Sequence, residues 1–360
     1  MILGCISETA DFEKRVMLNP DGVKKIKSLG LDIMIPKNYG LSSDYSDEEY
    51  KAFGAIISED NEVSQKSDII LKISQRNITD FKFKKGANLI IGFFNNNDEK
   101  AINLIKQNNQ KIFALNLLPR ITRAQAMDVL SSQANLAGYK AVIDTAYEFQ
   151  KALPMMMTAA GTVTPAKYFI LGAGVAGLQA IATAKRLGAV VSATDVRLAS
   201  KEQVESLGAK FIFVKDQEDM ETTGGYAKEA SEEFKKKQEI LIKETVKTQD
   251  IIICTALIPG KKAPRIITEE MVLSMKPGSV ICDLAAAQGG NSAFSEPDKI
   301  IIKHGVKIIG YSNYASRIPG SASALLSKNI INFLSLIFNK EKKIIEIKED
   351  DEIIKGVLLK

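Results

Sequence analysis

An apolar strand, a glycine-rich turn and a helix follow one another without interruption near the middle of the chain. The apolar run Lys167–Leu171 opens into the pattern Gly-x-Gly-x-x-Gly, and apolar residues then recur at helical spacing. In a dinucleotide-binding turn the first glycine bends the chain, the second lets a pyrophosphate approach the backbone, and the third lets the helix pack on the strand. The phosphates lie against the free N–H groups of the helix start. The residues that we expect to hold a pyrophosphate are Gly172, Gly174, Val175, Ala176 and Gly177.

A second strand-like run, Ala189–Thr194, ends in Asp195, which lies 23 residues beyond Gly172. A carboxylate at this place accepts both hydroxyls of an adenosine ribose and repels a 2′-phosphate. Arg197 by itself would suit a 2′-phosphate, but that phosphate would meet the charge of Asp195 at short range. We therefore expect NAD(H) to bind here, with contacts from Asp195, Val196 and Arg197.

The composition is that of a globular protein, with 45% hydrophobic and 25% charged residues. The 48 basic and 43 acidic residues are intermixed, so no basic stripe for nucleic acid is present. Cys5, Cys254 and Cys282 lie in apolar runs without metal or redox spacing, and we expect buried free thiols and no metal site. No signal peptide and no apolar run of about 18 residues is found, so we expect no membrane span.

Strand-like and helix-like segments alternate along the chain, which is typical of parallel sheets with helices on their faces. The strands expected in the first half are Ile2–Ile6, Leu31–Ile35, Ile69–Ile73, Leu89–Phe94 and Ile112–Leu117, with helices at Pro20–Leu29 and Ala101–Gln107. The strands expected in the second half are Lys167–Leu171, Ala189–Thr194, Lys210–Val214, Ile251–Leu257, Ser279–Leu284 and Val306–Tyr311. These six match the doubly wound mononucleotide-binding pair.

A long helical pattern from Arg123 to about Leu153 is interpreted as a connector between two domains. The helix expected at Ala322–Phe338 and the tail after it are left over once the second sheet is complete, so we expect them to return to the first domain. Residues 1–130 with 312–360 then form an N-terminal Rossmann-like domain, and 131–311 an NAD(H)-binding Rossmann domain. The predicted fold class is α/β, with two Rossmann-like parallel-sheet domains separated by a cleft and linked by a long helix. Ligands usually bind in such clefts.

Several long strings outside the fingerprint resemble one family, the NAD(H)-binding component (domain I, or alpha-1 subunit) of proton-translocating NAD(P) transhydrogenase, within the alanine dehydrogenase/transhydrogenase superfamily. The strings are Pro119–Asp128, Ser131–Gln133, Asn135–Tyr139, Pro154–Thr162, Gly224–Glu229, Thr255–Lys261 and Met275–Ile281. The likeness covers nearly the whole chain and is densest from Arg120 to Gly310.

The resemblance implies an enzyme, an Si-specific transhydrogenase alpha subunit, that exchanges hydride between NAD(H) bound here and NADP(H) on a partner beta subunit. A membrane-spanning subunit would couple the exchange to proton movement. The chain would be a homodimer, peripheral on the cytoplasmic side of the inner membrane. The residues that match the family's catalytic positions are Arg120, Gln125, Asp128 and Ser131. Tyr226 matches a lid that closes on NAD(H), and Ala256 and Leu257 match cofactor contacts.

Two of these positions also have a plain structural interpretation. Gln125 and Asp128 are three residues apart, so they share one face if the segment is helical. An arginine–aspartate–glutamine cluster can hold a carboxamide and neighbouring hydroxyls. The same residues could instead cap a helix N-terminus, and the two roles are compatible.

The alternative function is an NAD-dependent amino-acid dehydrogenase of the alanine type, which shares the fold. That reaction needs proton donors beside the substrate, whereas exchange between two nicotinamides needs orientation and electrostatics. The single histidine, His304, is interpreted as a surface residue in a turn, and Leu89–Asn95, where the dehydrogenases carry their catalytic histidine, has none. This absence favours the transhydrogenase.

Other features bear on the same choice. Lys72 stands where the dehydrogenases place a substrate lysine, and we interpret it as a strand-end lysine extending to water. Gln288 matches the dehydrogenases, and Ala287 replaces an acidic residue of the transhydrogenases. We expect Met155–Met157 to pack at the domain junction. A cofactor-sensing protein without turnover would explain the glycines but not the string at Arg120.

Overall fold

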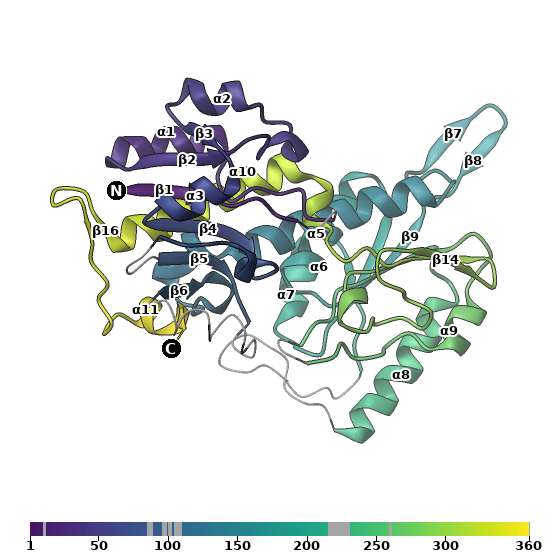
Figure 1. The fold of residues 1–360 in the computed structure, drawn as a ribbon. Helices are drawn as coiled ribbons and strands as arrows, with labels where there is room; N and C mark the ends of the chain where they lie inside the picture. Colours follow the sequence, from purple (N-terminus) through teal and green to yellow (C-terminus); the bar gives the residue numbers. More distant parts are fainter. Residues whose placement is uncertain are drawn as a thin grey trace. The chain divides into compact units, whose positions relative to one another are not determined.

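The computed structural model describes residues 1–9, 12–84, 89–95, 110–214, 231–258 and 261–359, and the single positions 99 and 103. The chain forms two compact units: unit 1 is residues 1–133 with 315–360, and unit 2 is residues 134–314. Each unit contains a seven-stranded, mostly parallel sheet (Figure 1). The predicted α/β fold with two Rossmann-like sheets is confirmed.

The sheet of unit 1 is parallel except at one edge, where the last strand of the chain runs antiparallel to its neighbour. Its order is β18 (Leu358–Leu359), β6 (Lys111–Ala114), β5 (Leu89–Phe93), β4 (Ile69–Ser74), β1 (Ile2–Cys5), β2 (Asp32–Pro36) and β3 (Ile56–Ser58). Neighbouring residues of a strand face opposite sides, so Ile69 and Leu71 belong to one apolar core and Ile70 to another. β3 and β18 were not predicted, because they have only three and two residues.

Helices cover both faces of this sheet. α1 (Pro20–Leu29), α10 (Pro319–Ile337) and α11 (Glu352–Val357) contribute to one core, and α3 (Asp60–Lys66) lies over β1 and β2 on the other face. α10 buries a stripe of apolar residues, of which Phe333 packs edge-on against Phe113 of β6 with ring centroids 5.3 Å apart. Burying such a side chain stabilises the fold by about 1.5–3 kcal/mol. The C-terminal segment therefore belongs to the core of unit 1. The other short elements of the unit are η1 (Leu41–Ser43), α2 (Asp47–Ala52), η2 (Ile78–Asp80), η3 (Leu115–Leu117), η6 (Ala315–Arg317), β16 (Phe338–Asn339) and β17 (Ile344–Ile345).

The sheet of unit 2 has the strand order of a dinucleotide-binding fold. Its order is β11 (Lys210–Phe211), β10 (Val190–Thr194), β9 (Lys167–Leu171), β12 (Ile251–Cys254), β13 (Val280–Asp283), β15 (Val306–Ile309) and β14 (Ile300–Lys303). The six predicted strands form the 3-2-1-4-5-6 arrangement, and β14 adds an antiparallel edge strand that was not predicted. α5 (Val129–Glu148) and α6 (Val175–Arg186) contribute to the core on one face, and α8 (Glu232–Val246) and α9 (Glu269–Ser274) to the core on the other. Short elements are α7 (Ser200–Ser206) and η5 (Ala286–Gln288).

The predicted continuous helix from Arg123 to Leu153 is wrong. A 3₁₀ helix, η4 (Thr122–Met127), ends at Asp128, whose backbone is extended with φ −70° and ψ 92°. The Asp128 carboxylate accepts a hydrogen bond from the Ser131 N–H at 2.9 Å, which caps the start of α5. The helical periodicity continues across the break, and so the sequence pattern concealed it. α5 begins in unit 1 and continues in unit 2.

The prediction that Met155–Met157 pack at a domain junction is also wrong. These residues enter the hairpin of β7 (Met156–Thr158) and β8 (Gly161–Val163), which projects from unit 2 (Figure 1). Met155 is 62% exposed and Met157 81% exposed. His304 lies in another hairpin turn, between β14 and β15, where it and Gly305 both have positive φ. It is exposed, as predicted.

The three cysteines are buried and outside any disulfide, as the sequence predicted. Burial raises the pKa of the Cys5 thiol to about 12 and raises that of Cys254 well above its ordinary value. Among the residues that the structure describes, no helix combines the length and apolar character that a membrane crossing requires.

Because the thiolate is the reactive form, we predict that the folded chain resists an aromatic disulfide reagent at pH 8. Titration in denaturant should reveal all three thiols of Cys5, Cys254 and Cys282. Absorbance of the released thiol measures both states. Rapid modification of the folded chain would contradict the assigned burial.

Candidate functional site

The glycine-rich turn joins β9 to α6 at the carboxyl edge of the unit 2 sheet. Gly172 has φ +98°, a conformation that side chains disfavour. At Gly177 a Cβ would lie 1.9 Å from the Gly172 carbonyl oxygen, so this glycine permits the close packing of α6. At Gly174 a Cβ would meet nothing within 4 Å. The open space over Gly174, at the start of α6, fits the approach of a pyrophosphate to the backbone.

Asp195 ties this turn to the end of β10. One carboxylate oxygen accepts the Ala173 N–H at 2.7 Å, and the other accepts the Arg197 N–H at 2.8 Å. The Arg197 guanidinium pairs with the same carboxylate at 2.9 Å. The Asp195 carboxylate therefore fixes the backbone of the turn at Ala173, and the Arg197 guanidinium balances its charge.

The end of β12 completes this edge on the other side of β9. The Thr255 hydroxyl donates to the carbonyls of Leu171 and Gly172 at 3.1 and 3.0 Å. The buried Asn291 carboxamide makes two hydrogen bonds to the backbone of Ala256. It accepts from the N–H at 3.1 Å and donates to the carbonyl at 2.9 Å. Leu257, the next residue, is exposed. Thr255 and Asn291 were not predicted as site residues; a polar residue directly after a buried strand was the available signal for Thr255.

The predicted site residues are divided between the units, and Arg120, Gln125, Asp128 and Ser131 belong to unit 1. Arg120 and Gln125 are exposed. Asp128 and Ser131 are linked by the cap and by a second bond, from the Ser131 hydroxyl to the carboxylate at 2.6 Å. The helix-capping interpretation of Asp128 is thus confirmed. Gln125 and Asp128 do not share an α-helical face, because the 3₁₀ helix ends between them.

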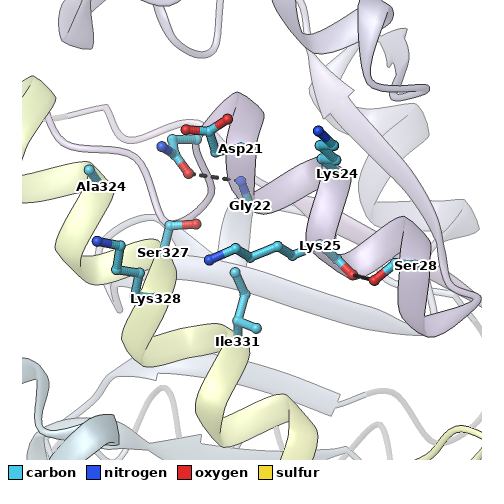
Figure 2. Close-up of a pocket in the computed structure, with 10 residues that line it drawn as sticks. Asp21, Gly22, Lys24, Lys25, Ser28, Ala324, Ser327, Lys328 and Ile331 are labelled. Atoms are coloured by element: carbon cyan, nitrogen blue, oxygen red, sulfur yellow. Dashed lines mark hydrogen bonds between the residues drawn. The ribbon is translucent and has the colours of Figure 1, made fainter.

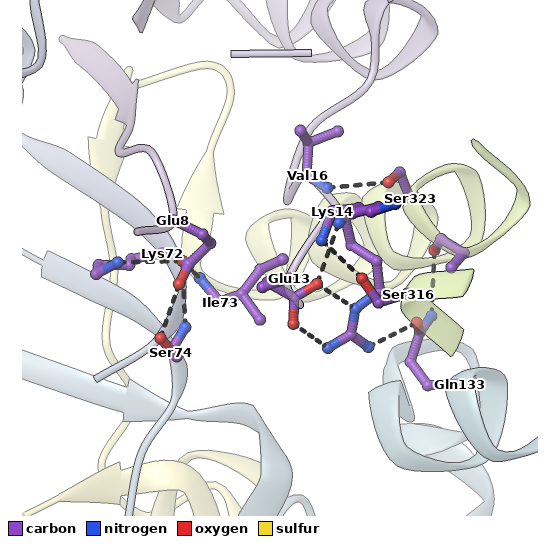
Figure 3. A network of polar contacts seen from close by, with 12 residues as sticks. Glu8, Glu13, Lys14, Val16, Lys72, Ile73, Ser74, Gln133, Ser316 and Ser323 are labelled. Atoms are coloured by element: carbon purple, nitrogen blue, oxygen red, sulfur yellow. Dashed lines mark hydrogen bonds and ion pairs between the residues drawn. The ribbon is translucent and has the colours of Figure 1, made fainter. Parts of the chain in front are cut away.

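Lys72 does not extend to water, contrary to the sequence interpretation. Its side chain is fully buried, and its ammonium pairs with Glu8 at 3.2 Å (Figure 3). The ammonium also donates to the Ser7 carbonyl at 3.3 Å. Glu8 also accepts from the Ile73 N–H at 2.8 Å and the Ser74 hydroxyl at 2.7 Å. A buried ammonium requires such a partner, and the neighbouring N-terminal segment supplies it.

A second network of unit 1 links Glu13 to Gln133, both labelled in Figure 3, through the side chain of Arg15. Its guanidinium donates two hydrogen bonds to the Glu13 carboxylate, at 2.8 and 2.7 Å, and a third to the side-chain oxygen Oε1 of Gln133 at 2.9 Å. Gln133 in turn donates to the Ala322 carbonyl at the start of α10. The N-terminal segment is thereby fastened to α5 and α10.

A surface pocket of about 560 Å³ lies between α1 and α10 (Figure 2). Lys24, Lys25 and Lys328 line it together with Asp21 and Ser327. None of the predicted site residues contributes to it. We therefore take the fingerprint turn of unit 2 and the loop at Arg120 of unit 1, each by itself, as the candidate functional regions in place of this pocket.

Tyr226 and His304 were both considered in the sequence analysis, and the structure describes only His304. Tyr226, which the resemblance assigns to a lid, lies outside the described residues. His304, in its exposed turn, contacts the ring of Phe294 at 6.2 Å between centroids. None of the predicted catalytic positions is a histidine, and the orienting role expected of them in hydride exchange stays a prediction.

Comparison with known proteins gives a consistent family. The model of the alanine dehydrogenase/PNT N-terminal domain matches residues 4–137, and that of the C-terminal domain matches residues 141–360. The first part of NAD(P) transhydrogenase subunit alpha of Rhodospirillum rubrum is 52% identical, over 96% of this chain and 92% of that protein. A crystal structure of transhydrogenase from Sinorhizobium meliloti superposes with a TM-score of 0.89 at 47% identity, covering 100% of this chain and 98% of that one.

Alanine dehydrogenases are more distant. Alanine dehydrogenase 1 of Staphylococcus aureus is 27% identical, over 99% of this chain and 92% of that protein. The similarity therefore favours the transhydrogenase subunits by a wide margin.

The different surroundings of Gly174 and Gly177 generate a stability prediction. Gly177→Ala should destabilise the chain by about 1–3 kcal/mol, because its methyl group would meet a backbone carbonyl that cannot yield. Gly174→Ala, whose methyl group enters open space, should change stability by less than about 1 kcal/mol. Urea unfolding followed by circular dichroism measures both. Equal losses would contradict the assigned packing.

Proposed function

The chain belongs to the alanine dehydrogenase/PNT family, and we propose that it is the NAD(H)-binding component of a proton-translocating transhydrogenase. Its relatives named NAD(P) transhydrogenase subunit alpha are 40–52% identical. The observation that carries the proposal is the open backbone at Gly174. This glycine follows the central strand of a sheet with the strand order of a dinucleotide-binding fold, in a chain that is similar to transhydrogenase subunits.

In the proposal, unit 2 is the NAD(H)-binding domain, corresponding to about residues 131–311. The N–H groups at the start of α6 hold the pyrophosphate beside Gly172, Gly174 and Gly177, as at other helix N-termini. Asp195 accepts an adenosine ribose hydroxyl when Arg197 releases part of its carboxylate, and the backbone at Ala256 and Leu257 borders the same edge. Val175, Ala176 and Val196 complete the contact set, and Tyr226 closes over it.

The bound cofactor supplies a nicotinamide that gives or accepts a hydride. The chain's own task is to orient this group and exclude water. We assign that role to Arg120, Gln125 and the capped pair Asp128–Ser131, whose donors and acceptors suit a carboxamide and ribose hydroxyls. No proton transfer is required of them.

The alternative, an amino-acid dehydrogenase, has less support. Lys72, the candidate substrate lysine, is buried and already neutralised by Glu8. The only histidine stands in an exposed hairpin turn far along the chain from β5. A proton donor for a keto acid would have to come from elsewhere.

We assign NADP(H) to a separate beta subunit and proton movement to a membrane-spanning subunit. The chain would then sit peripherally on the cytoplasmic side of the inner membrane. The Rhodospirillum rubrum relative is named as one part of a subunit alpha, which supports the existence of further subunits. A homodimer is supported by the β7–β8 hairpin, because an isolated projecting hairpin with exposed methionines gains stability by burial against another chain.

Hydride exchange is tested by mixing the purified chain with an NADP-binding component of a known transhydrogenase. Reduction of an acetylpyridine analogue of NAD by NADPH should appear in the absorbance only when both are present. Gly174→Ala should weaken NADH binding about tenfold or more, since its methyl group occupies the space of the pyrophosphate.

Two results would contradict the proposal. One is the absence of exchange with a partner that is active with its own subunit. The other is NAD-dependent oxidation of alanine by the chain alone, which would establish the dehydrogenase.

For the dimer, replacing Met155 and Met157 with glutamate should convert a dimer into a monomer, because burying the new charges in an interface is costly. Light scattering after gel filtration measures the mass. Ile302→Glu, at an exposed apolar residue of β14, is the matched control and should stay dimeric. A monomeric wild-type chain would refute the assignment.

A further inference from the structure

The loop that carries Arg120, Gln125 and Asp128 is held by residues from the far end of the chain. The carbonyl of Ala126, inside η4, accepts the Asn329 side-chain N–H at 2.9 Å and the Asn332 side-chain N–H at 3.0 Å. Asn329 and Asn332 are three residues apart on α10 and so share a face. A carbonyl oxygen has two lone pairs, and these donors use both.

Asn329 also fastens the segment after the loop. Its side-chain oxygen accepts the Ser132 hydroxyl at 2.7 Å, and Ser132 lies in the first turn of α5. Asn329 is 7% exposed, whereas Asn332 is exposed. A buried carboxamide with both ends bonded joins α10, η4 and α5 at one point.

The last helix holds the other end of the loop. The Arg123 guanidinium makes two bonds to Asp351, at 2.8 and 2.9 Å, and this hydrogen bonding lowers the pKa of the Asp351 carboxyl. Gly356 of α11 lies against Pro119, the residue before Arg120; a Cβ there would be 2.8 Å from the proline ring. Ala124 and Met127 pack into the same core as α10 and α11.

The need for such anchors follows from the loop itself. A 3₁₀ helix has poorer hydrogen-bond geometry than an α-helix, and η4 is flanked by extended residues on both sides. The side chains of Gln125 and Arg120 are exposed, so burial of these side chains does not fix the loop backbone. The position of the backbone then depends on what its carbonyls and core side chains contact.

We propose that Asn329, together with the second donor Asn332, is a positioning residue that fixes the backbone of residues 122–128. It thereby holds Gln125 and Asp128 in the geometry that hydride exchange requires. The inference rests on the proposed function, since it assigns the loop a role in that reaction. The C-terminal return thereby acts on the reaction through the backbone of η4, without itself supplying a catalytic residue.

The test uses Asn329→Asp combined with Asn332→Ala in the full chain. An aspartate keeps the shape and the acceptor for Ser132 but has no N–H for Ala126. Ser335→Ala on the same helix is the control, because within the described part of the chain that hydroxyl donates only to the Ile331 carbonyl of α10 itself. The Asn332→Ala single variant removes one exposed donor and should give an intermediate effect.

Two readouts are measured on each variant. Amide deuterium exchange of residues 122–128 should speed up about tenfold or more in the double variant. The hydride exchange rate at saturating cofactor should fall by about ten- to hundredfold, as expected for misplaced orienting groups. The NADH dissociation constant should stay within about twofold, because the contacts proposed for the pyrophosphate and the adenosine, which hold the cofactor, lie in unit 2.

Unchanged amide deuterium exchange at residues 122–128 would overturn the proposal. A loss of hydride exchange rate that is matched by weaker NADH binding and general destabilisation would also overturn it. If the wild-type chain shows no hydride exchange, the proposed function fails instead. The amide measurement then still decides whether Asn329 fixes the loop. Should the double variant not fold, the Asn332→Ala variant must show the intermediate acceleration.

Discussion

The contact on which the candidate site depends is the approach of α6 to β9 at Gly177. No side chain fits there, because a Cβ would lie 1.9 Å from the carbonyl of Gly172. This closeness puts the start of α6 directly at the end of the central strand. The carboxylate of Asp195 and the hydroxyl of Thr255 then fasten the same turn from the two neighbouring strands. The proposed position of the pyrophosphate follows from the resulting open backbone at Gly174.

A second constraint operates in unit 1, where the C-terminal residues 315–360 pack with residues 1–133. α10 and α11 fill the core beside Phe113, and they also bond to the loop that precedes α5. Packing and orientation are thus provided by the same helices. Loss of apolar area there would reduce stability, whereas loss of the two asparagine donors should chiefly disturb the loop.

The sequence predicted most strands of the two sheets because these strands are continuous apolar runs. At Ile251 the strand was found, but it ends at Cys254, before the predicted end at Leu257. α1 was predicted with its observed bounds, since Asn19 and Pro20 mark its start and Gly30 its end. The break at Asp128 was missed because the apolar period runs through it. The partner of Lys72 was missed because Glu8 lies 64 residues earlier in the chain, and only the parallel pairing of β1 with β4 brings them together. Asn329 was likewise invisible, since its role is defined by a carbonyl and not by a side-chain pattern.

The central claim is that the fingerprint turn of unit 2 binds NAD(H). Parallel fluorescence titrations of the wild-type chain with NADH and NADPH test it most directly. The account predicts that NADH binds at least about tenfold more tightly, a difference of about 1.4 kcal/mol, because a 2′-phosphate would approach the Asp195 carboxylate. Equal affinities, or a preference for NADPH, would contradict it.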